Sequence, residues 1–191
     1  HADELTAAVP EDPQSESSLP LFQEKKLLGV GLIIFLFDQA TKLLAVRHFK
    51  TPDPIDGGMV VIQGFLNFTY RLNTGAAWSI FEGRNTILAL VAVLALAGLL
   101  YYRRHFDNGT ATGKLALGLL VGGVLGNLVD RLIHNGVVDF IDFYIQRANG
   151  TYWHWPAFNI ADAAICTGVG LLFVMAWRTE NAEDETPSAN G

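Results

Sequence analysis

The sequence predicts an all-α integral membrane protein with four transmembrane helices and a small extracytoplasmic β-sheet cradle. Three observations lead to this fold class: half of the 191 residues are hydrophobic, four long apolar runs follow one another, and one connection between runs alternates in polarity. A helix needs about 20 mostly apolar residues to cross a bilayer. The length of the runs therefore disfavours the alternative, a soluble helical bundle. The runs are approximately residues 27–46, 86–102, 115–129 (extendable to 114–132) and 160–177.

The charge of the chain is unevenly distributed. Its net charge of −6 comes from two polar ends: residues 1–24 carry six acids and residues 179–191 carry four, and neither segment contains Lys or Arg. Both ends are rich in Pro, Ser, Ala and acids, and such a composition buries too little apolar surface to fold. We therefore expect two disordered acidic tails around one membrane domain, residues 25–178, which has nine acids against thirteen basic residues.

Basic residues near the helix ends predict the orientation. Counted over all connections they show no bias, with six on one side and seven on the other, but the short link 103–114 carries three of them close to helix ends. The positive-inside rule has most weight at such positions. We therefore expect both termini in the cytoplasm and two long extracytoplasmic connections, about residues 47–84 and 133–159.

The first of these connections contains a predicted strand. Residues 66–73 alternate between apolar and polar side chains, a period of two that indicates a half-buried strand, and residues 59–62 are a candidate hairpin partner. The second connection is rich in rings that prefer the membrane–water boundary. These features predict a small sheet that lies on the bilayer surface or grips an extended chain.

Glycines recur every four residues in the third run, at Gly118, Gly122 and Gly126. A ridge of small residues lets a second helix approach closely in a membrane. Tight helix packing is the preferred interpretation of this pattern.

Charged groups at membrane depth each cost at least ~2.5–3.5 kcal/mol, so each needs a partner or a role. Asp38 and Lys42 stand four residues apart with the acid first, the favourable order for a helical ion pair, and a structural pair is the preferred interpretation. Asn127 and Arg131 share a helix face, with Asp130 beside them. Both an anchoring network and a substrate-holding site remain open for this group.

Asp162 heads the fourth run. Asn159 is a good N-cap, and Asp162 would then be the third helical residue, where free N–H groups and the helix dipole favour a carboxylate. Two further acids, Asp139 and Asp142, lie in an apolar setting on the same side of the membrane. Two acids kept close in a low-dielectric site cannot both ionise easily, so one holds a proton while the other draws a proton from water. The spacing alone does not choose between Asp139 and Asp142.

The sequence offers few residues for other kinds of catalysis. Outside the tails the only serine is Ser79. A thiol mechanism would need a histidine near the single cysteine, Cys166, which lies in the fourth apolar run, but His48, His105, His134 and His154 all fall outside the apolar runs. No pair of histidines has zinc-ligand spacing, and nothing resembles a phosphate loop or a nucleic-acid-binding face. A proton-coupled transporter would also keep acids at membrane depth and is the alternative function, but the acids cluster at one leaflet and no repeat is evident.

Five motifs follow one another along the four runs. They are DQATK (38–42), RLNTGAAWSIF (71–81), GGVLGNLVDR (122–131), VVDFIDFY (137–144) and FNIADAAI (158–165). Together they resemble the bacterial lipoprotein signal peptidase family, also called signal peptidase II. The resemblance spans about residues 25–178 and leaves out both tails. Trp78 stands where we expect Phe, a change between aromatic residues.

The resemblance implies an intramembrane aspartyl endopeptidase of the bacterial inner membrane, with its active site near the outer leaflet. It implies removal of the signal peptide from diacylglyceryl-modified prolipoproteins by cutting before the lipidated cysteine. The family's two catalytic aspartates match Asp139 and Asp162. Positions that line the family's site match Asn73, Asn127, Arg131 and Asn159, and further polar positions match Asp38, Lys42 and Asp130. Expected partners are therefore prolipoproteins and membrane lipids, and we expect a monomer without a metal or cofactor.

Overall fold

The structure is a computed structural model that describes residues 24–50, 58–75, 84–107 and 109–184. These residues form five helices and four strands. In chain order the elements are α1 (Lys25–Phe49), β1 (Met59–Ile62), β2 (Leu66–Asn73), α2 (Asn85–Tyr101), α3 (Arg103–Asp107), α4 (Ala111–His134), β3 (Val137–Gln146), β4 (Tyr152–His154) and α5 (Ile160–Asp184).

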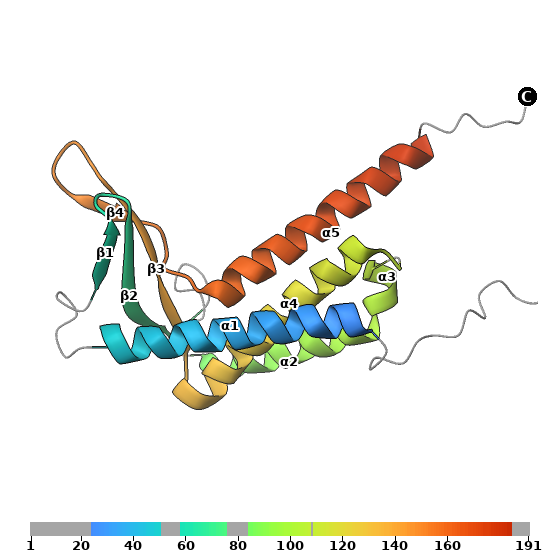
Figure 1. The fold of residues 1–191 in the computed structure, drawn as a ribbon, viewed down its shortest axis with the longest axis horizontal. Helices are drawn as coiled ribbons and strands as arrows, with labels where there is room; N and C mark the ends of the chain where they lie inside the picture. The colour runs from blue at the N-terminus through green and yellow to red at the C-terminus, as the bar shows by residue number, and fades with distance from the viewer. Residues whose placement is uncertain (1–23, 51–57, 76–83, 108, 185–191) are drawn as a thin grey trace, which may run out of the picture.

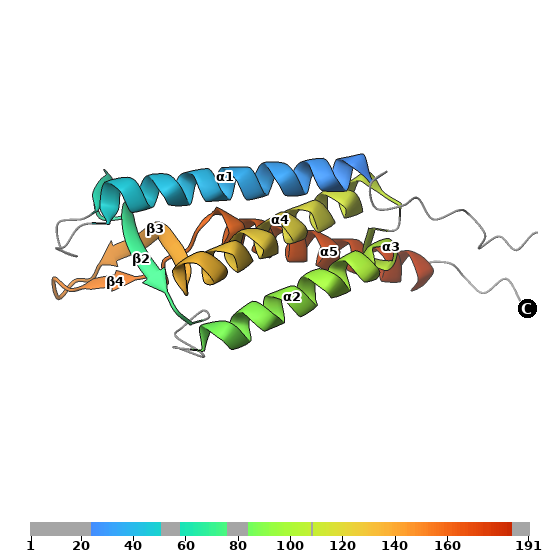
Figure 2. The same cartoon turned by 90° about the horizontal axis from the view of Figure 1, so that it is seen from below.

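Helix α4 is the centre of the helical part. Helices α1, α2 and α5 all pack against α4, and α5 diverges from the others toward the C-terminus (Figures 1 and 2). Three described helices are long and apolar enough to cross a membrane: α1, α4 and residues Ile160–Thr179 of α5. Helix α2 is apolar but has only 17 residues. The fold is therefore mostly helical, with three candidate spans where the sequence predicted four.

The glycine ridge of α4 is the surface on which α1 packs. A Cβ atom added at Gly122 would lie 2.5 Å from the backbone oxygen of Gly31, and one added at Gly118 would lie 2.7 Å from the Cβ of Val30. Real Cβ atoms do not approach other atoms this closely, so only glycine permits the contact between these helices. The predicted close packing of a small-residue ridge is confirmed for the described residues.

The sheet stands at one end of the helices (Figure 1) and is antiparallel, with strand order β1-β2-β3-β4. The predicted strand 66–73 and its hairpin partner 59–62 are both present. Gly64 supports the turn between them with a φ of 76°, and its N–H donates to the Tyr144 hydroxyl at 2.9 Å. Strands β3 and β4 were not predicted.

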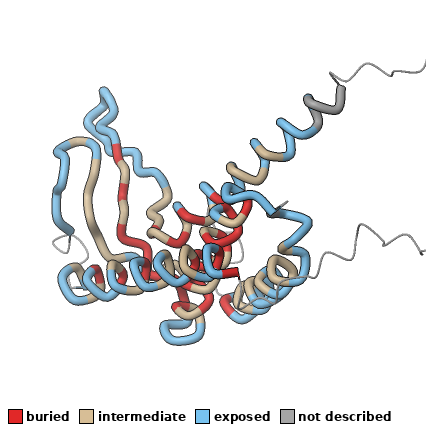
Figure 3. Tube along the Cα trace, turned by 45° about the vertical axis from the view of Figure 1, so that its right-hand side comes forward, coloured by how far each residue is buried: buried red, intermediate tan, exposed pale blue. Residues whose placement is uncertain are grey.

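Buried residues follow α4, the first half of β3 and the start of α5 (Figure 3). One apolar cluster joins Leu27 to Leu117 and Leu120 between α1 and α4. A second cluster joins Ala45 at the end of α1 to Val138 and Phe140 of β3. This second cluster fixes the sheet to the helices at the place where α4, β3 and α5 meet.

The ends of the membrane domain differ from the prediction in two details. Helix α5 continues to Asp184, so the segment expected as a C-terminal tail begins as helix. Glu24, expected in the N-terminal tail, is mostly buried and pairs with Lys114 at 2.9 Å. The remainder of both predicted tails lies outside the described residues.

Candidate active site

The start of α5 is fixed by a reciprocal pair of hydrogen bonds between Asn159 and Asp162. The backbone N–H of Asp162 donates to Asn159 Oδ1 at 2.9 Å, and the backbone N–H of Asn159 donates to Asp162 Oδ2 at 3.2 Å. This arrangement is a capping box, in which each side chain satisfies a free N–H of the first helical turn. The predicted cap is therefore present, and it holds the Asp162 carboxylate at the mouth of the helix.

Asp139 lies on β3 and receives two amide hydrogen bonds. Asn73 Nδ2 donates to Oδ2 at 3.0 Å from the neighbouring strand β2, and Asn159 Nδ2 donates to Oδ1 at 2.8 Å. Only 3% of Asp139 is exposed. Burial raises the pKa of Asp139 from 3.8 to about 7, and the nearby charge of Asp162 adds to the increase.

Asn127 of α4 connects the two carboxylates through its amide. Its Nδ2 donates to Asp162 Oδ1 at 2.7 Å, while its Oδ1 accepts from Asn159 Nδ2 at 3.2 Å and from Lys42 Nζ at 2.9 Å. Because two donors occupy the oxygen, the amide has one orientation and its NH₂ group faces Asp162.

The predicted Asp38–Lys42 ion pair is present, with 2.8 Å between Nζ and Oδ2. Asp130 completes a buried cluster, because its Oδ2 lies 3.1 Å from the same Nζ. Gln39, which the sequence analysis missed, donates to Asp130 Oδ1 at 3.0 Å. Charges at this depth are thus paired, as their burial requires.

Asp38 and Asp130 also position the elements that carry a second pair of acids, Asp139 and Asp162, called the dyad below. Asp130 Oδ2 accepts from the backbone N–H of Val138 at 2.9 Å, one residue before Asp139. Asp38 Oδ1 accepts from the backbone N–H of Ala161 at 2.9 Å, one residue before Asp162. The Lys42 cluster therefore holds β3 and α5 in place.

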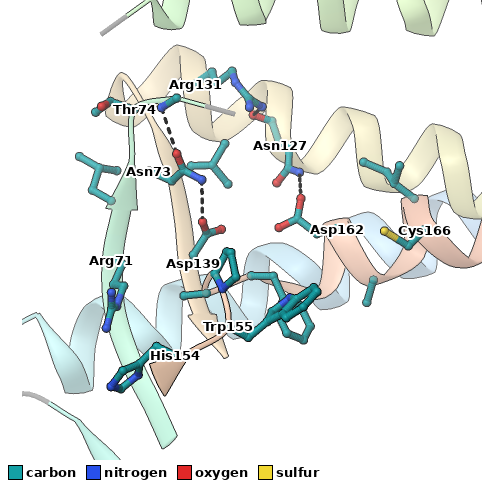
Figure 4. A pocket seen from close by; sticks show the side chains of 18 residues that line it. Arg71, Asn73, Thr74, Asn127, Arg131, Asp139, His154, Trp155, Asp162 and Cys166 are labelled. Atoms are coloured by element: carbon teal, nitrogen blue, oxygen red, sulfur yellow. Dashed lines mark hydrogen bonds between the residues drawn. The ribbon is translucent and has the colours of Figure 1, made fainter. Parts of the chain in front are cut away.

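Both dyad carboxylates open on a single pocket of about 870 Å³ (Figure 4). In the close-up Asp139 and Asp162 face one another, the first from β3 and the second from α5. Asn73, Asn127 and Arg131 also line the pocket, and the Arg131 guanidinium donates to the backbone oxygen of Asn127 at 3.2 Å. A pair of acids in one desolvated site has the composition that activates a water molecule.

Asp142 lies further along β3 and is separate from this pair. Its carboxylate accepts from His154 Nδ1 at 2.9 Å and faces Arg71 Nη2 at 4.0 Å. Asp139 lines the pocket together with Asp162, whereas Asp142 does not. The geometry thus makes the choice between Asp139 and Asp142 that the spacing left open.

Two pocket residues were missed by the sequence analysis, Arg71 and His154. The alternation of residues 66–73 placed Arg71 on the same face as Asn73 and was the signal available for it. No local sequence pattern indicates that His154 lies in the pocket. Among the described residues, no group of three or more His, Cys, Asp or Glu side chains is placed to hold a metal ion.

Comparisons with known proteins agree with this geometry. The family model for Signal peptidase (SPase) II matches residues 30–178. The lipoprotein signal peptidase of Halalkalibacterium halodurans is 35% identical over 84% of this chain and 97% of its own length. That of Bacillus subtilis is 37% identical over 76% and 88%, and that of Nitratidesulfovibrio vulgaris is 41% identical over 82% and 92%.

Two solved structures also resemble the chain. A bacterial membrane enzyme solved by the in meso method at 2.3 Å resolution matches with a TM-score of 0.70 and 31% identity, over 84% of this chain and 93% of the other. A second, at 1.9 Å resolution, matches with a TM-score of 0.63 and 32% identity, over 78% and 91%. The paired carboxylates, the fold around them and the similarity along most of the chain lead to one conclusion: the chain belongs to the signal peptidase II family.

Proposed function

We propose that Asp139 and Asp162 hold the water molecule with which this enzyme hydrolyses its substrate. As a member of its family the chain is an aspartic peptidase that removes signal peptides from prolipoproteins. The observation that carries the proposal is the pocket itself, on which both carboxylates open while asparagine amides donate hydrogen bonds to them. The transporter considered from the sequence is set aside, because the similar proteins are peptidases.

In the proposed mechanism Asp139 holds the shared proton in the free enzyme. Its raised pKa supports this assignment. We assign the ionised form to Asp162, because Asn127 Nδ2 and the Asn159 N–H donate to its carboxylate and the helix start stabilises negative charge there. Asp162 takes a proton from the water as the water oxygen attacks the scissile carbonyl carbon, and Asp139 gives its proton to the carbonyl oxygen.

Collapse of the resulting diol completes the reaction. The C–N bond breaks, Asp162 passes the proton it took from water to the leaving amine, and the signal peptide departs with a new carboxylic acid, which then loses its proton to water. Asp139 regains a proton from the second diol hydroxyl, so the pair returns to its starting state. Asn73 and Arg131, which line the same pocket, hold the substrate and stabilise the developing negative charge.

The membrane setting completes the proposal. The apolar helices and the family indicate a multi-pass protein of the bacterial inner membrane. We further propose that α2 is the fourth crossing, that both termini are cytoplasmic, and that the sheet and the pocket lie near the outer leaflet. The substrate is then a diacylglyceryl-modified prolipoprotein whose acyl chains lie in the surrounding lipid, and the enzyme acts as a monomer.

A cleavage assay with purified protein tests the proposal. The substrates are one prolipoprotein with and without its diacylglyceryl group, and the readout is release of the signal peptide. We expect Asp139→Asn and Asp162→Asn each to abolish cleavage of the modified form. Glu24→Gln, a buried carboxylate at the opposite end of α1, is the matched control and keeps activity. Normal cleavage by either dyad variant refutes the water-holding pair, and equal cleavage of both substrates refutes the lipid requirement.

A further inference from the structure

A second polar cluster lies at the rim of the pocket, around Asp142 of β3. The Asp142 side chain is 4% exposed, and both of its oxygens accept from His154 Nδ1, at 2.9 and 3.0 Å. Arg71 Nη2 lies 4.0 Å from Asp142 Oδ2. Arg71 and His154 line the same pocket as the dyad, whereas Asp142 lies behind them. The buried acid therefore holds two basic side chains at the pocket wall.

The position of His154 leaves one ring nitrogen for a ligand. Nδ1 donates its proton to the Asp142 carboxylate, so Nε2 is the ring nitrogen that can bond to a ligand, as an acceptor in the neutral imidazole or as a donor in the charged form. The Tyr144 ring stacks on the imidazole, with centroids 5.5 Å apart and planes 20° apart, and this contact fixes the ring orientation. Among the described residues, the structure records no hydrogen bond to Nε2.

The Arg71 guanidinium is accessible to a ligand. More than half of its side chain is exposed, and the acid nearest to it also serves His154. At 4.0 Å the contact between Arg71 and Asp142 is at the limit of an ion pair, and the exposed Arg71 end of the pair is screened by water. The guanidinium is thus free to attract a further negative group at the rim.

The pocket has two chemically different ends. In Figure 4 Arg71 and His154 lie on one side of the dyad and Cys166 lies on the other, further along α5. Helix α5 is a candidate membrane span, so the Cys166 end is apolar and the sheet end is polar. A signal peptide has an apolar core of about 7–15 residues. This segment fits the α5 end, and the chain that follows the cleaved bond then crosses the sheet end.

We propose that Arg71 and His154, held by Asp142, form a subsite for the first residues after the cleaved bond, and that Arg71 favours an acidic side chain there. The inference rests on the proposed function, since it takes the dyad as the position of the cleaved bond. Arg71 supplies the charge preference. His154 Nε2 forms a hydrogen bond with the bound chain and therefore contributes to binding whatever side chains that chain carries.

Three substrates test the charge preference. They are the same modified prolipoprotein with Glu, Gln or Lys at the second and third positions after the cleaved bond. We expect kcat/KM to fall in the order Glu, Gln, Lys, by about two- to fivefold per step, the range for an exposed ion pair. Arg71→Glu reverses the order, and Arg71→Gln removes it. Because each variant is judged by a ratio between its own substrates, partial loss of folded protein does not affect the result.

Arg147→Glu is the matched control, since it makes the same change in the exposed turn after β3 and outside the pocket. We expect it to keep the wild-type order, and His154→Gln to lower kcat/KM for all three substrates through a higher KM. An order that survives Arg71→Glu, or an absence of any order in the wild type, overturns the subsite. Unchanged kinetics in His154→Gln remove His154 from it. A failure of the proposed function gives a different result from a failure of the subsite. If the dyad does not carry out the hydrolysis, Asp139→Asn cleaves the three substrates as the wild type does.

Discussion

Asn159→Ser separates the two roles of a single buried side chain. Asn159 caps α5 through its Oδ1 and donates through its Nδ2 to Asp139. Serine is about as good a cap as asparagine, so the helix start is kept. The amide that stabilises the ionised form of Asp139 is lost.

The loss of that amide raises the pKa of Asp139 further. A hydrogen bond to a charged group contributes roughly 1.5–3 kcal/mol, and about 1.4 kcal/mol corresponds to one pKa unit. Starting from about 7, the pKa of Asp139 is expected to rise by roughly 1–2 units. If Asp139 is the acid that must keep its proton, the alkaline limb of kcat/KM moves to higher pH by the same amount.

The assay is the pH dependence of kcat/KM for wild type, Asn159→Ser and Asn159→Ala, with thermal unfolding measured alongside. Asn159→Ala loses the cap as well, which costs about 1 kcal/mol more, yet its alkaline limb is expected to match that of the serine variant. An alkaline limb that stays in place or moves to lower pH in Asn159→Ser refutes the assignment of the proton to Asp139.

Three further predictions concern stability in detergent micelles. Burial raises the pKa of Asp139 from 3.8 to about 7, so the free energy of unfolding falls by up to about 4 kcal/mol as pH rises through this window. The melting temperature of Asp139→Asn, measured relative to wild type, should therefore be higher at pH 8 than at pH 5. Equal differences at the two pH values would contradict this. Lys42→Met leaves the buried carboxylates of Asp38 and Asp130 without their cation, which lowers the free energy of unfolding by about 3–5 kcal/mol. Adding Asp130→Asn to this variant should recover part of the loss in melting temperature. No recovery would show that the buried charges do not cause the loss. Gly122→Ala should lower the melting temperature, because overpacking at the contact with α1 costs about 1–3 kcal/mol. Gly29→Ala, which has open space around it, should not. Equal effects of the two substitutions would contradict close packing at the glycine ridge.

The parts of the fold that the sequence predicted are those encoded by local patterns. The alternation of residues 66–73 and the pair Asn159 and Asp162 each express a structure within a few residues, and both are present. Strand β3 was missed because residues 137–140 are buried on both faces, so the sequence shows no alternation between apolar and polar side chains there. Its partner β2 lies more than 60 residues away in the chain, which no local pattern records.

The same limit applies to the candidate site. The spacing of Asp38 and Lys42 predicted their ion pair, but the contacts of Lys42 with Asp130 and Asn127 cross between helices. The sequence therefore treated these as separate polar groups, whereas the structure joins them in one network. Residues matched through the family resemblance stay predictions in their catalytic and binding roles until variants are assayed.

The bond from Val138 to Asp130 has a consequence for how the chain tolerates insertions and deletions. No tight turn sets the register between β2 and β3, because α2, α3 and α4 intervene. The register is held instead where α4 passes into β3, since Asp130 fixes Val138. One residue gained or lost between His134 and Val137 would turn Asp139 outward and bring a neighbour inward. Length changes in the turn 147–151 would leave the carboxylate in place, so natural variation in length is expected there and not at the α4–β3 junction.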